Sequence, residues 1–241
     1  MEVIVKASAD AAAEYVHDLM VEQLRAFPAS VLGLPTGGTP LPVYARLVES
    51  YRAGRVSFKQ ATTFNLDEYI GLGSEHAASY ATYMRHHLFD LVDCPAEQRH
   101  IPDGLTLDIA AEAAGYDQAI AAAGGMDFLL LGLGRNAHIG FNEPGSDFAS
   151  RTRAVDLDPS TIAANAQYFG QGANPPSRAL SMGIATILEA RRIVVLATGA
   201  SKAWAVRCMV RDTPTTDVPG SALQLAGNVT VVLDGAAASE L

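Results

Sequence analysis

The chain has 241 residues, of which 49% are hydrophobic and 18% are charged, and its formal net charge is −9 at pH 7. This composition is typical of a globular protein with a large buried core, and chains of about 200–250 residues are common as one α/β domain. The acidic charge and the lack of any lysine and arginine cluster argue against nucleic acid or an anionic membrane as the main partner.

The cysteines and the N-terminus indicate the compartment. Cys94 and Cys208 lie far apart in the chain and match no metal-binding or redox spacing, so they read as ordinary thiols of a reducing compartment. The N-terminus lacks the basic start and long apolar core of a signal peptide. No apolar run approaches the ~18 residues of a membrane span. We therefore expect a cytoplasmic protein.

Apolar runs and amphipathic stretches alternate along the chain. The predicted strands cover residues 3–5, 30–34, 61–66, 126–131, 193–198 and 229–233. The predicted helices cover residues 9–26, 40–52, 78–91, 108–123, 159–167 and 178–190, with a last helix opened by 199–202. Thr39 suits the N-cap of the second helix, and Pro40 suits its first position.

This order of elements predicts the fold class. Strands that alternate with helices and consist mostly of continuous apolar residues indicate an α/β fold, with a largely parallel sheet covered by helices on both faces. Residues 126–131 form the most apolar strand and are therefore expected near the centre of the sheet. No repeat or long linker divides the sequence, so residues 1–241 are expected to form a single domain.

Polar stretches follow four of the predicted strands directly. They are residues 36–40, 67–69, 132–143 and 199–202. In open α/β sheets, ligands bind in the crevice beyond the carboxyl ends of the strands. The topology therefore predicts that these stretches, though scattered in sequence, meet in one site.

Two of these stretches have the composition of anion-binding turns. Residues 36–39 (Thr-Gly-Gly-Thr) and 199–202 (Gly-Ala-Ser-Lys) each place glycine before a predicted helix, where backbone N–H groups and the helix dipole favour negative charge. Either turn alone would also fit an ordinary helix cap. Two of them at one edge of a sheet favour a phosphate site.

The other two stretches carry groups that transfer protons. His138 lies between glycines and is followed by Glu143, which can orient it or share its proton. Asp67 follows a strand and suits a base for enolisation beside a carbonyl, although it could also cap a turn and Glu68 could supply the charge instead.

A nicotinamide enzyme is the alternative suggested by the spacing of Gly132, Gly134 and Ala137. That fingerprint should open a helix and be followed about 20 residues later by an acidic residue after a strand. Here it opens onto His138 and a tract rich in proline and glycine, and the next clear strand begins only at Ile193. The dinucleotide interpretation is therefore disfavoured, and no cofactor is expected.

Five blocks of sequence resemble the glucosamine-6-phosphate deaminases in order and spacing. They are LGLPTGGTP (32–40), TFNLDEYIGL (63–72), LGLGRNAHIGFNEP (131–144), SRTR (150–153) and SALQL (221–225). The resemblance implies a Rossmann-like fold of the ribose-5-phosphate isomerase and CoA-transferase type. It also implies an enzyme of amino-sugar metabolism and N-acetylglucosamine catabolism, a hydrolase and ammonia-releasing isomerase. Such an enzyme converts glucosamine 6-phosphate and water to fructose 6-phosphate and ammonia without a metal or cofactor.

The resemblance also implies roles for individual residues. His138 accepts a proton as the sugar ring opens, supported by Glu143 and Asn136, and Asp67 then moves a proton between C2 and C1. Gly38, Thr39 and Lys202 match phosphate-binding positions. The full set of expected substrate-binding residues is Thr36, Gly37, Gly38, Thr39, Gly134, Ala137 and Lys202.

Two residues depart from the family pattern. Position 136 is aspartate in the best-known members, and Asn136 cannot hold a charge, so Glu143 should be the main electrostatic support for a His138 imidazolium. Gln167 stands where the family often has a phosphate-binding arginine. Losing that cation should weaken phosphate binding unless Arg135, Arg151 or another arginine replaces it.

Three rival functions follow from the same residues. None of these motifs indicates which configuration at C4 of the sugar is bound, so galactosamine 6-phosphate is an alternative substrate. A 6-phosphogluconolactonase-like hydrolase is a second rival, disfavoured by residues 64–69 and 138–144. The third is a sugar-phosphate-binding regulator without catalysis. In each case the expected partner is a small phosphosugar, and the sequence does not distinguish a monomer from a homo-oligomer.

Overall fold

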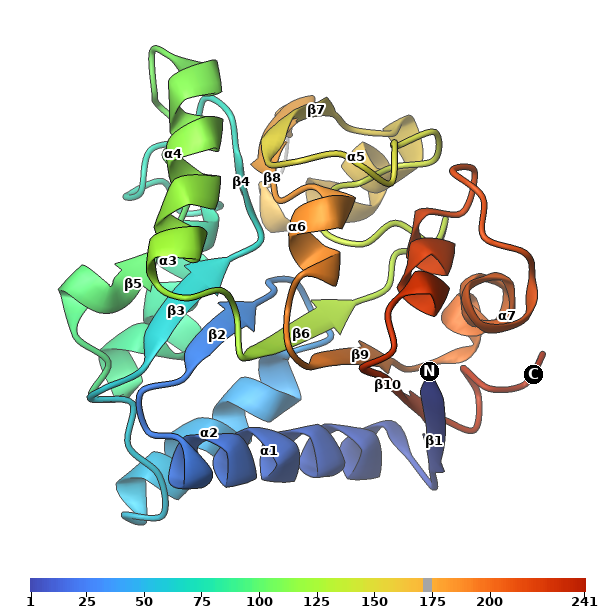
Figure 1. Ribbon diagram of the computed structural model, residues 1–241, viewed down its shortest axis with the longest axis horizontal. Coiled ribbons are helices and arrows are strands. Elements are labelled where there is room, and N and C mark those ends of the chain that lie inside the picture. Colours follow the sequence, from blue (N-terminus) through green and yellow to red (C-terminus); the bar gives the residue numbers. More distant parts are fainter. Residues whose placement is uncertain (171–174) are drawn as a thin grey trace.

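The computed structural model describes residues 1–170 and 175–241 and contains a seven-stranded sheet with the strand order β1-β10-β9-β6-β2-β3-β5 (Figure 1). Each pair of neighbours in this sheet is parallel. Its strands are β1 (Glu2–Lys6), β2 (Val31–Leu34), β3 (Thr62–Asn65), β5 (Arg99–His100), β6 (Phe128–Gly132), β9 (Ile193–Ala197) and β10 (Val229–Asp234). The predicted α/β class and the central place of β6 are confirmed.

Helices cover both faces of the sheet. They are α1 (Ala9–Ala26), α2 (Leu41–Arg52), α3 (Tyr80–His87), α4 (Ile109–Ala122), α5 (Pro159–Asn165), α6 (Ile184–Leu188) and α7 (Ala203–Arg211). Figure 1 shows α1 and α2 on one side and α4, α6 and α7 on the other. None of the helices in the described residues is long and apolar enough to cross a membrane.

The alternation of side chains along β6 explains why this strand is apolar throughout. Phe128 and Leu130 pack in the core cluster formed with α1 and α2, whereas Leu129 and Leu131 pack in the cluster formed with α4, α6 and α7. Successive side chains of a strand point to opposite faces. A strand covered on both sides therefore has no polar position.

A second sheet of three antiparallel strands was not predicted. It has the order β4-β8-β7 and consists of β4 (Asp67–Tyr69), β8 (Arg178–Ser181) and β7 (Arg153–Asp156). The prediction of one helix over residues 178–190 was wrong, because β8 precedes the short α6. Its central position, paired with β4 on one side and β7 on the other, fixes residues 178–181 as extended and overrides their local preference.

The start of α2 also differs from the prediction. Pro40 is the N-cap rather than the first helical residue, and no side chain caps this helix, so Thr39 does not fill the expected role. The Pro40 carbonyl accepts the first helical hydrogen bonds, from the N–H groups of Val43 and Tyr44 at 3.0 Å each. The residues between β2 and α2 therefore lie outside the helix, and they line a cavity.

Candidate active site

A cavity of about 490 Å³ opens at the carboxyl ends of β2, β3, β6 and β9. All four polar stretches predicted to meet at this edge contribute to its wall. The cavity is lined by Pro35, Thr36, Gly37, Gly38, Thr39, Leu66, Asp67, Tyr80, Gly132, Leu133, Gly134, Arg135, Asn136, His138, Gly140, Phe141, Ser160, Thr161, Ala164, Asn165, Gln167, Tyr168, Thr198, Ser201 and Lys202. The topological prediction is therefore correct for the place of the site.

The loop after β6 folds back so that His138 lies against Gly134. A Cβ added to Gly134 would stand 2.5 Å from the His138 ring, so only glycine fits at this position. The Gly134 N–H donates to the His138 carbonyl at 2.9 Å, which closes the turn. Ala137, inside the turn, has a φ of 64°, an uncommon conformation for alanine that the surrounding contacts hold in place.

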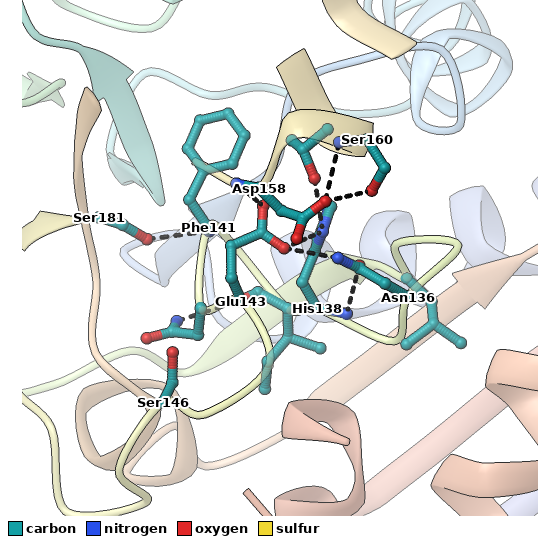
Figure 2. A network of polar contacts seen from close by, with 12 residues as sticks. Asn136, His138, Phe141, Glu143, Ser146, Asp158, Ser160 and Ser181 are labelled. Carbon is teal, nitrogen blue, oxygen red and sulfur yellow. Dashed lines mark hydrogen bonds and ion pairs between the residues drawn. The ribbon is translucent and has the colours of Figure 1, made fainter. Parts of the chain in front are cut away.

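His138, Asn136 and Glu143 form one hydrogen-bonded group (Figure 2). The same Glu143 oxygen, Oε2, lies 3.2 Å from His138 Nδ1 and accepts from Asn136 Nδ2 at 2.7 Å. The His138 N–H faces Asn136 Oδ1 at 3.3 Å. The amide of Asn136 thus joins the histidine backbone to the carboxylate.

The environment of Glu143 keeps its carboxylate charged. Burial alone would raise its pKa, but the hydrogen bond and charge of His138, together with hydrogen bonds from Thr161 and Asn136, lower the pKa below its ordinary value. An ionised Glu143 can only accept a hydrogen bond here, so Nδ1 of His138 carries the proton in this contact. That contact leaves Nε2 as the basic nitrogen of the His138 ring, and His138 lines the cavity.

Asp67 faces the same cavity from β4. Asp67 is 7% exposed, and burial, followed by the charge of Glu68, raises the pKa of its carboxyl to about 8. The backbone of Asp67 is fixed by its pairing with Ser181 of β8. A buried carboxyl that points into a cavity is suited to exchange a proton with a bound molecule.

The adjacent Glu68 has a different place. Its oxygens accept from the N–H groups of Tyr69 at 2.9 Å and of Tyr80 and Ala81 at 3.0 Å each, at the first turn of α3. Burial raises its pKa to about 7 although these N–H groups act in the opposite direction. Glu68 does not line the cavity, so the geometry favours Asp67 of the two carboxyls left open by the sequence.

A further part of the cavity wall is suited to an anion. Within the described residues, none of the amides of residues 36–39 donates a hydrogen bond to a protein acceptor. Lys202 lines the cavity and donates from Nζ to the Leu133 carbonyl at 2.6 Å. Burial, and then the charge of Arg135, lower its pKa to about 8, which means that an anion bound here would stabilise the ammonium form.

Gln167, which stands where the family often has a phosphate-binding arginine, and the two arginines that could replace that cation lie in different places. Gln167 lies at the cavity, and its side-chain amide donates to the Ala164 carbonyl at 2.9 Å. Arg151 lies outside the cavity, where its guanidinium forms an ion pair with Glu189. Arg135 lines the cavity near Lys202.

Most of the predicted site residues come together, with one exception. Ala137 is fully buried and does not line the cavity. Glu143 is not part of the cavity wall either, but it contacts His138 and Asn136 directly. The other nine predicted residues, Thr36, Gly37, Gly38, Thr39, Asp67, Gly134, Asn136, His138 and Lys202, line the cavity.

Residues from α5 and α3 were missed by sequence reasoning. Thr161 lies 3.5 Å from His138 Nδ1 through its Oγ1, and Asn165 donates to the Tyr69 hydroxyl at 2.9 Å. Tyr80 lines the cavity from α3. The helix over 159–167 was predicted, but its position over the site depends on the second sheet, which has no signal in the sequence.

The chain matches known proteins over most of its length. Residues 5–232 match the family model described as glucosamine-6-phosphate isomerases/6-phosphogluconolactonase. A glucosamine-6-phosphate deaminase of Rhodopirellula baltica is 56% identical over 233 residues, which are 96% of this chain and 92% of that protein. One of Shewanella loihica is 48% identical over 99% of this chain and 89% of that protein.

Solved structures give the same family. A monomeric glucosamine-6-phosphate deaminase matches with a TM-score of 0.97 and 41% identity, covering 100% of both chains. A 6-phosphogluconolactonase from Trypanosoma cruzi matches with a TM-score of 0.81 and 22% identity, covering 100% of this chain and 96% of that one. At that identity the second likeness concerns the fold alone.

Replacing Asp67 by asparagine should change how stability depends on pH. The folded protein holds the Asp67 proton more tightly than the unfolded chain does, because the pKa rises from 3.8 to about 8 on folding. The stability that this proton provides is fully present below about pH 4 and is lost as the pH rises through about 8. We expect Asp67→Asn to gain stability over the wild type between these values, and the gain to level off above them.

Urea unfolding of both proteins at a series of pH values measures this gain. A stability difference that stays constant from about pH 4 to about pH 9 would contradict the raised pKa.

Proposed function

Because the chain belongs to the family of glucosamine-6-phosphate isomerases and 6-phosphogluconolactonases, we propose that it converts D-glucosamine 6-phosphate and water to D-fructose 6-phosphate and ammonia. The observation that carries the proposal is Asp67, a buried carboxyl at a cavity whose wall also contains residues 36–39 and Lys202. An enolising base and an anion site in one cavity are what a phosphosugar isomerase requires.

The reaction is an isomerisation that releases ammonia. The relatives support a deaminase, and they do not support the class of hydrolase that was expected from the sequence. Water enters the balance only when the C2 imine, formed by the isomerisation, is converted to a ketone with loss of ammonia.

In the first step we assign ring opening to His138. Its Nε2 takes the proton of the C1 hydroxyl, and the imidazolium returns that proton to the ring oxygen as the bond from this oxygen to C1 breaks. The imidazolium so formed is opposed by the Glu143 carboxylate, 3.2 Å from Nδ1. The effect of that negative charge is strong because both side chains are largely buried. Asn136 holds the carboxylate in place by donating to it at 2.7 Å.

In the second step Asp67 removes the proton from C2 of the open aldehyde and delivers it to C1. As the C2 proton leaves, the aldehyde oxygen takes a proton from the ammonium group of the substrate, which gives an enol amine. Protonation of C1 then leaves a C2 iminium beside a C1 hydroxyl. Asp67 must be ionised to act, and burial raises its pKa to about 8, which makes the carboxylate a stronger base than an exposed aspartate. The resulting iminium takes up water and loses ammonia.

A lactonase is the second function to weigh. Opening a lactone by water requires no proton transfer between two carbon atoms, which is the step proposed for Asp67. The lactonase structures share 16–24% identity with this chain, whereas the deaminases share 41–56%. The site and the relatives both favour deamination.

Ammonia release, coupled to glutamate dehydrogenase, tests the proposal directly. We expect turnover with glucosamine 6-phosphate, and fructose 6-phosphate formed in equal amount. Galactosamine and mannosamine 6-phosphates serve as epimeric comparisons, and 6-phosphogluconolactone tests the rival hydrolase. Faster release from an epimer would reassign the substrate, and phosphosugar binding without any ammonia would indicate a regulator.

Glu143→Gln should lower kcat at least tenfold. Glutamine still accepts a hydrogen bond from His138 but carries no charge to stabilise the imidazolium, an effect worth about 1.4 kcal/mol or more. Glu189→Gln is the matched control, because Glu189 pairs with Arg151 outside the cavity. Initial rates over a range of pH measure the effect. A near-wild-type pH–rate profile for Glu143→Gln would remove Glu143 from ring opening.

Arg135→Gln should raise KM for the phosphosugar about tenfold and leave kcat nearly unchanged. The guanidinium lies at the cavity near Lys202, where it can attract phosphate in the ground state and the transition state alike. The salt dependence of KM should fall as well. Arg151→Gln is the control. If that variant instead raised KM, the replacement cation would be Arg151.

A further inference from the structure

The loop between β2 and α2 exposes backbone amides to the cavity, and one of its peptide groups is unusually free to rotate. The peptide between Gly37 and Gly38 is flanked by glycine on both sides, and Gly37 has a φ of 89°. Glycine adopts backbone conformations that other residues avoid. A flip of this peptide would turn a carbonyl oxygen toward a bound anion in place of an N–H group.

Two tyrosine hydroxyls hold this loop from behind. Tyr83 of α3 donates to the Gly37 carbonyl at 2.6 Å, and Tyr44 of α2 donates to the Pro35 carbonyl at 2.5 Å. Neither tyrosine lines the cavity, whereas Pro35 and Gly37 both do. The two carbonyls are therefore held on the side of the loop that faces away from the cavity.

The geometry of a trans peptide fixes where the amides point. The C=O of one residue and the N–H of the next point in opposite directions across a planar peptide, and the described residues contain no cis peptide bond. Because the Pro35 and Gly37 carbonyls are held on the side away from the cavity, the N–H groups of Thr36 and Gly38 point toward the cavity. Neither N–H donates to a protein acceptor in the described part of the chain.

We propose that Tyr44 and Tyr83 are positioning residues that aim the Thr36 and Gly38 amides at the phosphate of the substrate. The inference rests on the proposed function for the identity of the anion. Tyr83 prevents the flip of the peptide between the two glycines, and Tyr44 sets the peptide before it. Neither tyrosine touches the substrate.

The surroundings of the two tyrosines suit this role. Tyr44 is fully buried, and burial raises the pKa of both phenols, so that they remain protonated donors. Tyr83 lies one turn beyond the residues at the start of α3 whose N–H groups are held by the Glu68 carboxylate. Through Glu68, the neighbour of Asp67, the same helix connects the proposed base to the anion-binding loop.

Tyr83→Phe tests the proposal while keeping the aromatic ring. We expect the Kd for inorganic phosphate, measured by titration calorimetry, and the KM for glucosamine 6-phosphate to rise together, each by about tenfold, with kcat nearly unchanged. Loss of a hydrogen bond that acts only on the fold would not move the two constants in parallel. Tyr15→Phe is the matched control, because the Tyr15 ring contacts Lys6 and its hydroxyl has no partner in the described residues.

Wild-type phosphate affinity in Tyr83→Phe would overturn the role of Tyr83, and the same result in Tyr44→Phe would overturn that of Tyr44. Phosphate affinity is measured without turnover, so a wild type that releases no ammonia would refute the proposed function and leave this test intact. Amide NMR of the wild-type protein provides a measurement that does not depend on folding of the variants. The Thr36 and Gly38 N–H resonances should shift on adding phosphate, and unmoved resonances in a protein that binds phosphate would also overturn the proposal.

Discussion

The parallel register of β2, β3, β6 and β9 is the constraint on which the site depends. Parallel strands end at one edge of a sheet, so the stretches after them meet although Thr36 and Lys202, both at the cavity, are 166 residues apart in the chain. The core makes this edge rigid, since β6 is buried on both faces between two helical layers. Each strand contributes one type of group, and the chemistry arises only where they converge.

At the site, the pKa values of two carboxyl groups are shifted in opposite directions by their neighbours. Glu143 has His138, Asn136 and Thr161 as hydrogen-bond partners, and these outweigh burial and lower its pKa. Asp67 has burial and a second carboxyl beside it, and its pKa rises to about 8. In the proposed mechanism, one carboxyl therefore keeps its charge to support an imidazolium, and the other takes up and gives back a proton. Separated pKa values of this kind distinguish the roles of paired acids in a site.

The sequence was sufficient to predict six of the seven strands of the central sheet and most of the cavity wall, because periodicity and strand ends are local properties. The edge strand β5 was missed, since its two residues are too few to show a periodic pattern. The sequence could not predict the second sheet, since β4, β7 and β8 are short and are held as strands by pairing among segments distant in the chain. That sheet brings α5 over His138 and was therefore the reason that Thr161 and Asn165 were missed. The choice between Asp67 and Glu68 also required the structure, because adjacent residues of a strand face opposite sides. The start of α2 was misplaced for a local reason: Pro40 and Pro42 have no N–H group to mark where the helix begins.

Burial in the cavity disfavours charge of either sign, and the proposed substrate reverses this. The pKa of Asp67 is raised and that of Lys202 is lowered, both to about 8, so each group lies close to the boundary between its charged and neutral forms near neutral pH. A phosphate dianion beside Lys202 favours the ammonium form, and the substrate's own amino group near Asp67 favours the carboxylate. Charges that cost stability in the empty protein would thus be stabilised by the molecule on which they act. The free amides of the loop after β2 contribute to the same balance without being ionised, because a backbone N–H attracts phosphate at no cost in buried charge. Their direction then matters more than their number, which is why the carbonyls behind them must be held in place.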